Sequence, residues 1–259
     1  MKPEWVRLRV VLFLLLLSGP SWGAEPSPRA VKGVLDLRGL DLRQHPVSLN
    51  GEWVWYWHQL RAPNAPAVGF EHTPFPRLWN KSTWKGQPVP AEGYATYALT
   101  VLLPPRTSPV ALNLPDVYTA YRLYANGEVL AEGGKVGTDA ASTRPFWAPQ
   151  VRRILATGDT LRLVLHVANF HHSKGGPYKE ITLGNPDELQ LRLDTHRSLD
   201  FFLTGCLFMG GLFFLGLYVY GRRDHAILYF CLFCLTYSYR LVGTDEYALH
   251  QVFPNFSWH

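Results

Sequence analysis

The sequence contains few cysteines, and their positions limit the chemistry open to the protein. Only three of the 259 residues are cysteines, Cys206, Cys231 and Cys234, and all three lie in the apolar C-terminal part. A domain folded from the preceding residues therefore has no disulfide and depends on its hydrophobic core. Cys231 and Cys234 have the spacing of a redox motif, but they lack the βαβ context of thioredoxin-like proteins. We interpret them as packing residues.

Catalytic motifs are also missing. The sequence has no nucleophile elbow, P-loop or HExxH zinc motif. Glycoside hydrolysis needs two carboxylates about 5 to 9.5 Å apart, and the acidic residues of the predicted loops show no paired pattern. These residues are Glu71, Glu92, Asp116, Asp139 and Glu180. We therefore predict a protein that is not an enzyme and uses no cofactor.

A metal site and a nucleic-acid site are not predicted either. His171 and His172 could suit zinc or copper, but adjacent strand residues point to opposite faces and no third ligand is fixed by spacing. The formal net charge is +5, and removal of Lys2, Arg7, Arg9 and Glu4 with a signal peptide lowers it to +3. So small an excess is not typical of a nucleic-acid-binding protein.

An uncharged apolar run, Phe201 to Tyr220, dominates the C-terminal part. At a rise of 1.5 Å per residue, a helix of twenty residues matches a hydrocarbon core of about 30 Å. The alternatives are a buried core helix or a strand pair, but a small soluble domain rarely contains such a run. We predict transmembrane helices over residues 201–220 and 226–243, within a membrane block that starts at residue 198 and continues to residue 259.

The N-terminus has the pattern of a secretory signal peptide. A basic start and a short apolar run, Val10 to Leu17, precede small residues at Ser21 and Gly23 that permit cleavage. We predict a signal peptide over residues 1–23, so the domain that follows is exported. The first span then runs from outside to inside and places Arg222 and Arg223 in the cytoplasm, as the positive-inside rule prefers.

Residues 33–193 show the alternation of apolar and polar residues that is typical of β-strands. Trp53, Trp55 and Trp57 share one face of an extended segment, and such an aromatic stripe is more often core than a ligand platform. Asn126-Gly127 is the strongest hairpin signal, because both residues accept the positive φ of a type I′ turn. We predict an all-β sandwich or jelly roll.

Two less regular segments flank or interrupt these strands. Residues 24–32 are rich in proline and serine, which predicts a short linker. Residues 61–91 are rich in proline, which predicts an ordered loop region. Its Trp79 and Trp84 either pack back on the sheet or line a binding mouth.

Several segments carry a resemblance to known families. They are LDLRG (35–39), LNGEW (49–53), GYATYALTVLLP (93–104), LPDVYTAYRLYANGEVLAEGG (114–134), LRLVLHVANFHHSKGG (161–176) and FPNFSW (253–258). Most of them resemble the sugar-binding jelly roll that precedes the catalytic barrel of β-galactosidases and β-glucuronidases. More closely, the chain resembles the bacterial seven-transmembrane receptors with diverse intracellular signalling modules, which share its order of signal peptide, jelly roll and membrane block.

This resemblance implies a galactose-binding-like jelly roll in the periplasm, anchored in the bacterial inner membrane. It also implies a sensor that binds a carbohydrate-like or other small ligand and passes a signal through its membrane helices. Such receptors have seven spans and an output domain, whereas two spans are predicted here. We interpret the chain as truncated, or as part of a split receptor whose other helices and output module come from another chain. Homodimerisation is a further open possibility.

Two other functions remain as alternatives. A membrane-anchored carbohydrate-binding or scaffold protein would bind without signalling. A hydrolase-related enzyme would need a catalytic barrel encoded in the same reading frame. In the sensor interpretation, residues 189–198 have no flexible Gly/Ser linker, so we expect the last element of the domain to run directly into the first span.

Candidate ligand-binding residues are polar and aromatic side chains on loops or on the outer face of strands, because sugars need stacking and a few convergent hydrogen bonds. Structural roles compete with binding: Arg122 can pair with Glu128 or Glu132 across the hairpin, and Trp147 can simply cover the sheet. The candidates are Arg122, Tyr124, Lys135, Arg144, Trp147, Asn169, His171 and Lys174.

Overall fold

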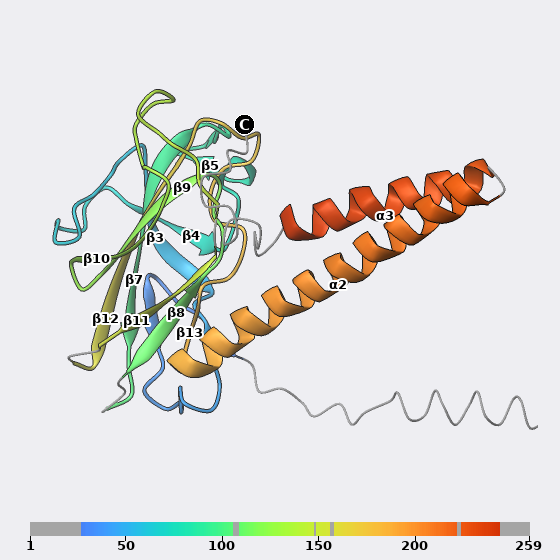
Figure 1. Cartoon of the computed structure of the whole chain (residues 1–259). Helices are drawn as coiled ribbons and strands as arrows, with labels where there is room; N and C mark the ends of the chain where they lie inside the picture. The colour runs from blue at the N-terminus through green and yellow to red at the C-terminus, as the bar shows by residue number, and fades with distance from the viewer. Residues whose placement is uncertain (1–26, 106–108, 148, 156–157, 222–223, 244–259) are drawn as a thin grey trace, which may run out of the picture.

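The computed structural model describes residues 27–105, 109–147, 149–155, 158–221 and 224–243. It shows a β-sandwich followed by two helices, of which the first extends away from the sandwich and the second folds back along the first (Figure 1). The predicted signal peptide, Arg222 and Arg223, and the segment 244–259 lie outside the described residues.

The larger sheet has seven strands in the order β10-β9-β12-β7-β3-β4, with β1 parallel to β7. Its strands are β1 (Val34–Asp36), β3 (Gly51–Trp57), β4 (Glu71–Phe75), β7 (Gly93–Leu102), β9 (Ala120–Ala125), β10 (Glu128–Gly133) and β12 (Thr160–Asn169). The central strands β7 and β12 pair along their full length, from Gly93 with Asn169 to Leu102 with Thr160. This ladder fixes the register of the whole sheet.

The smaller sheet has four strands in the order β11-β8-β13-β2. They are β2 (Val47–Ser48), β8 (Val110–Leu114), β11 (Gln150–Ile154) and β13 (Thr182–Gly184). A short 3-10 helix, η1 (Trp79–Lys81), precedes a two-stranded sheet of β5 (Thr83–Trp84) and β6 (Gln87–Pro88). The expected β-sandwich is therefore present.

The hydrophobic core lies between the two sheets. Trp53, Trp55 and Trp57 all point into it and are buried, as their shared face predicts. Of the two tryptophans in the proline-rich region, Trp79 is also buried, and the ring of Trp84 lies edge-on to Trp55 with centroids 5.2 Å apart. Both tryptophans thus pack against the sandwich.

The hairpin between β9 and β10 forms at the predicted turn. Asn126 and Gly127 have φ angles of 51° and 94°, as a type I′ turn requires. The start of the domain differs from expectation, because Ala30 pairs with Gly51 and is buried. Residues 30–32 of the predicted linker therefore belong to the sandwich. A Cβ at Gly51 would lie 2.3 Å from the carbonyl oxygen of Ala30, so this pairing needs glycine.

Helix α2 (Pro186–Tyr220) is a single helix of 35 residues. Asn185 caps it, because its side-chain oxygen accepts a hydrogen bond of 2.9 Å from the backbone N–H of Asp187. The first turns lie beside β8 and β11, where Leu189 and Leu193 are buried. The rest of the helix contains the predicted first span, so the domain does run into it without a break.

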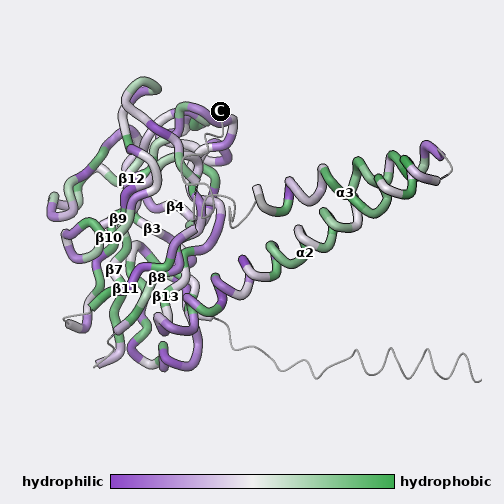
Figure 2. Tube along the Cα trace, viewed as in Figure 1, coloured by the Kyte–Doolittle hydropathy of each residue, from purple (hydrophilic) through white to green (hydrophobic). Residues whose placement is uncertain are grey.

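Among the described residues, α2 is the one helix long and apolar enough to cross a membrane. Figure 2 shows hydrophobic residues along most of its distal half. This agrees with membrane association, whereas the second span and the orientation stay predictions.

Helix α3 (His225–Gly243) packs against the distal half of α2. The Phe214 and Phe230 rings meet edge to face with centroids 4.7 Å apart. A Cβ at Gly211 would lie 2.8 Å from a methyl carbon of Leu235, so glycine permits this close approach. Cys231 and Cys234 are both buried, which agrees with a packing role.

Candidate functional site

The outer face of the larger sheet forms the floor of a groove. Side chains at alternate positions of β3, β7 and β12 point away from the core, and the strand register aligns them across the sheet. The three rows are Tyr56, Thr96 and His166; Val54, Ala98 and Val164; and Thr100 with Arg162. Because the central strand β7 contributes only small threonine and alanine side chains here, the floor is hollowed along its middle.

The loop that connects β3 with β4, residues 58–70, forms the wall of the groove. The Thr96 hydroxyl donates a hydrogen bond of 2.7 Å to the Gln59 carbonyl and accepts one of 3.0 Å from the Arg61 N–H. His166 Nε2 lies 2.7 Å from the Arg61 carbonyl oxygen. This nitrogen carries the proton, because a carbonyl can only accept. Two outward side chains of the sheet thus hold the loop in place.

Arg61 brings a cationic side chain to the base of this wall. Its guanidinium carbon lies 5.3 Å from the centroid of the Tyr56 ring, in a cation–π arrangement. Nη2 donates a hydrogen bond of 2.6 Å to the Pro66 carbonyl, while Nε is buried without a partner among the described residues. Burial raises the pKa of the Tyr56 phenol, and the nearby Arg61 charge partly opposes this rise.

The hollow between floor and wall has a volume of about 450 Å³. A smaller hollow of about 230 Å³ adjoins it beside the Asn126-Gly127 turn and shares Asn64, Arg162 and Val164 with it. Small-molecule sites usually have volumes of about 300 to 1,000 Å³ and combine apolar walls with a few polar groups. The groove has this size and composition.

Two predicted site residues lie beside the groove and do not line it. Arg122 on β9 forms an ion pair with Glu132 across the hairpin, which is one of the two structural partners that the sequence offered. The Tyr124 ring meets the His166 ring edge to face with centroids 5.1 Å apart. Both side chains therefore support the outer sheet face next to the wall.

Asn169 is a fully buried centre of hydrogen bonds at one end of the sandwich. Its Nδ2 lies 2.9 Å from the Ala91 carbonyl oxygen, 2.7 Å from that of His172 and 3.0 Å from that of Lys174. Its Oδ1 accepts hydrogen bonds from the backbone of His171 and His172. The side chain thus closes the loop that follows β12, and all its polar atoms are used internally.

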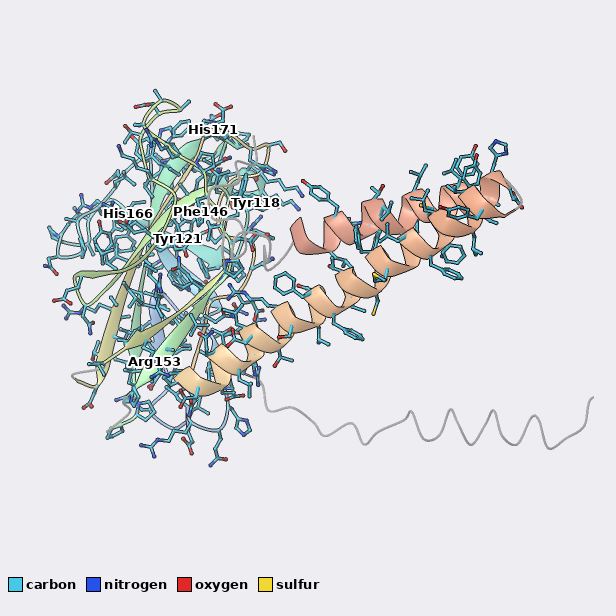
Figure 3. The ribbon with its side chains drawn as sticks, in the orientation of Figure 1. Tyr118, Tyr121, Phe146, Arg153, His166 and His171 are labelled. Atoms are coloured by element: carbon cyan, nitrogen blue, oxygen red, sulfur yellow. The ribbon has the colours of Figure 1, made fainter. Side chains whose placement is uncertain are left out.

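The other predicted residues lie on loops near this end. Lys135 and Arg144 pair through their backbones, with N–O distances of 2.8 and 3.0 Å. His171 Nε2 lies 3.2 Å from the Thr143 carbonyl oxygen, which links this loop to the one after β12. Trp147 is half-buried, and its Nε1 has no partner among the described residues. In Figure 3, His171 lies at the opposite end of the sandwich from Arg153.

An aromatic stack near these loops is filled by the protein itself. The Tyr118 ring lies between those of His172 and Tyr178, with centroids 4.3 and 4.5 Å away. Buried Asp116 accepts a hydrogen bond from the Tyr178 hydroxyl and pairs with Lys179 at 2.8 Å. Both faces of Tyr118 are therefore occupied, so this ring offers no stacking platform for a sugar.

The structure thus divides the eight predicted residues between the outer face of the larger sheet and the loops at one end of the sandwich, and none of them lines the groove. Sequence reasoning considered outward strand positions but did not identify Tyr56, Thr96 or Arg162. Two features of the sequence could have indicated them. The outward residues of β7, Thr96, Ala98 and Thr100, are all small, and a long proline-rich connection is available to cover them. Whether the eight residues bind a ligand stays a prediction.

No family model and no curated protein matches the chain. One similar solved structure is a β-glucuronidase from an uncultured Clostridium species, with 15% sequence identity, a TM-score of 0.44, and coverage of 54% of this chain and 28% of the enzyme. A second is the Faecalibacterium prausnitzii β-glucuronidase, with 14% identity, a TM-score of 0.44, and coverage of 55% of this chain and 31% of the enzyme. A third is a GH2 β-galacturonidase from Eisenbergiella tayi bound to galacturonate, with 13% identity, a TM-score of 0.41, and coverage of 57% of this chain and 26% of the enzyme. The chain covers less than a third of each enzyme. Similarity of this extent says nothing about the activity of this chain.

Proposed function

We propose that this chain is a membrane-anchored sensor that binds a small polar, carbohydrate-like ligand in the groove between the outer face of the larger sheet and residues 58–70. The sandwich faces the periplasm in this proposal, and α2 and α3 lie in the bacterial inner membrane. The helices pass ligand binding on to further helices or to an output module supplied by another chain.

The hollow of about 450 Å³ carries the proposal. Its wall is fixed to the sheet through Thr96 and His166, so the site is formed before a ligand arrives. A preformed site loses less free energy on binding, because fewer groups must be ordered. Asn64 and Thr100 supply hydrogen-bonding groups, as a polar ligand requires, while the Tyr56 ring is buried beneath Arg61 and forms part of the floor.

The joint between the sandwich and α2 supports the coupling step. Besides the two buried leucines of α2, Arg153 of β11 pairs with Asp187 at 2.6 Å. Arg197 Nη2 donates a hydrogen bond of 3.1 Å to the Pro149 carbonyl. Since Pro149 immediately precedes β11, the small sheet is tied to the helix just before the predicted span. A movement of the sandwich would therefore be transmitted to α2.

A thermal-shift screen of the full chain in detergent micelles tests binding. Mono- and oligosaccharides and common periplasmic metabolites are compared, because a ligand at 100 times its Kd stabilises by about 2.7 kcal/mol. Ala98→Trp, which fills the floor of the groove, should abolish the shift, whereas Ala140→Trp in an exposed loop should preserve it. If no compound stabilises the folded protein, or if Ala98→Trp leaves the shift intact, the groove is not the ligand site.

A further inference from the structure

We infer that the ligand of the groove is a monosaccharide-sized anion, a sugar acid or a sugar phosphate, and that Arg162 binds its charged group. This inference rests on the proposed function, because it assigns a chemical class to the ligand of the same site.

The charge of the groove is the first observation. Arg61 and Arg162 line it, and none of the described residues that line either hollow is Asp or Glu. Arg162 belongs to both hollows and thus stands where they meet. Two guanidinium groups without a facing carboxylate create a positive potential that favours an anionic ligand over a neutral one.

The position of the Arg162 guanidinium, within the groove and without a partner among the described residues, is the second observation. Some arginines of the sandwich, such as Arg38, Arg122 and Arg153, pair with a carboxylate of the protein, and others, such as Arg152, have no such partner in the ranges that the structure describes. For the Arg162 guanidinium, neither an ion pair nor a hydrogen bond is found within the described part of the chain. Its backbone is nevertheless held in place, because its N–H donates a hydrogen bond of 2.8 Å to Asn126 Oδ1. The fold therefore fixes the start of this side chain and leaves its charged end available.

Arg61 completes the arrangement from the wall. One terminal nitrogen is used by the Pro66 carbonyl and the ring of Tyr56 lies below the guanidinium, while the buried Nε keeps an unused N–H. A planar guanidinium with free N–H groups matches the geometry of carboxylate and phosphate oxygens. The volume of the main hollow, about 450 Å³, suits a ligand of roughly one sugar ring with its charged group.

Isothermal titration calorimetry of the full chain in detergent, with glucose, glucuronate and glucose 6-phosphate, tests the inference. These ligands share a ring and differ at C6. We expect at least one anion to bind about tenfold or more tightly than glucose, because hydrogen bonds to charged groups are stronger than neutral ones. Its affinity should fall with rising salt. The tighter of the two anions identifies the sugar acid or the sugar phosphate.

Variants locate the charge recognition. Arg162→Gln should weaken binding of the preferred anion about tenfold or more, and Arg162→Lys should weaken it less because the charge remains. Arg152→Gln, at an exposed position of β11 in the other sheet, is the matched control and should leave affinity within about twofold, since its charge lies outside the groove. A cooperative thermal unfolding transition, measured without ligand, verifies that each variant is folded.

Two outcomes would overturn the inference. If glucose binds as tightly as both anions and Arg162→Gln has no effect, the ligand class is wrong but the proposed function stands. If none of the three compounds binds, the anion class is also wrong, and the wider screen with Ala98→Trp decides separately whether the groove binds any ligand.

Discussion

Replacement of Leu189 tests whether α2 is docked on the sandwich in solution. The Leu189 side chain is 3% exposed, whereas Leu191, two residues further on, is 66% exposed. Leu189→Ala removes three buried carbon atoms, which costs about 2.4 kcal/mol at about 0.8 kcal/mol each. A residual cavity would add to this cost. Leu191→Ala should change stability by less than about 0.5 kcal/mol.

Hydrogen exchange of the backbone amides in residues 186–197 measures this cost locally. A docking equilibrium weakened by about 2.4 kcal/mol should raise exchange of these amides roughly fiftyfold in Leu189→Ala. Amides of β7 and β12, deep in the larger sheet, should not change. Equal exchange in the Leu189→Ala and Leu191→Ala variants would refute the docking of α2 on β8 and β11 and, with it, the proposed coupling.

Two further predictions concern buried polar groups. Burial lowers the pKa of His166, and the charge of Arg122 adds to this although the hydrogen bond to the Arg61 carbonyl opposes it. The unfolded chain thus takes up the proton more readily, so stability should fall as pH drops through about 6.5. In His166→Gln, the free energy of unfolding should fall less between pH 7.5 and 5.5, as measured by urea unfolding. An unchanged pH dependence in this variant would contradict the role of His166. Asn169→Ala should cost at least about 2 kcal/mol because the hydrogen bonds of this buried amide to the Ala91, His172 and Lys174 carbonyls are lost, whereas exposed Asn64→Ala should cost less than about 0.5 kcal/mol. If the two variants unfold at the same urea concentration, contacts other than those of Asn169 hold the loop after β12.

The β-sandwich could be predicted because its signals are local. Leu161, Leu163 and Leu165 recur at every second position, and this period of two identifies a strand and its buried face from neighbouring residues alone. The turn at Asn126-Gly127 depends on the backbone preferences of those two residues. The continuity of the domain with α2 followed from the lack of a flexible linker.

The groove could not be predicted because it depends on contacts between distant residues. His166 meets the Arg61 carbonyl across 105 positions of sequence, and Thr96 meets Gln59 only because β3 and β7 are neighbours in the sheet. Asn169 is the opposite case, because the sequence favoured it as a ligand-binding residue and the structure shows its hydrogen bonds to be internal. A polar residue at the end of a strand suits a ligand site, but burial and three nearby carbonyls give it a structural role.

The unbroken length of α2 has a mechanical consequence. From Arg197, which hydrogen-bonds the Pro149 carbonyl, to Tyr220 the helix extends about 35 Å at 1.5 Å per residue. A tilt of about 5° at the docked end would move the far end sideways by about 3 Å, which exceeds the helix shifts of about 1 to 2 Å seen at many allosteric interfaces. A lever of this kind amplifies a small rearrangement of the small sheet into a displacement that a neighbouring helix would register.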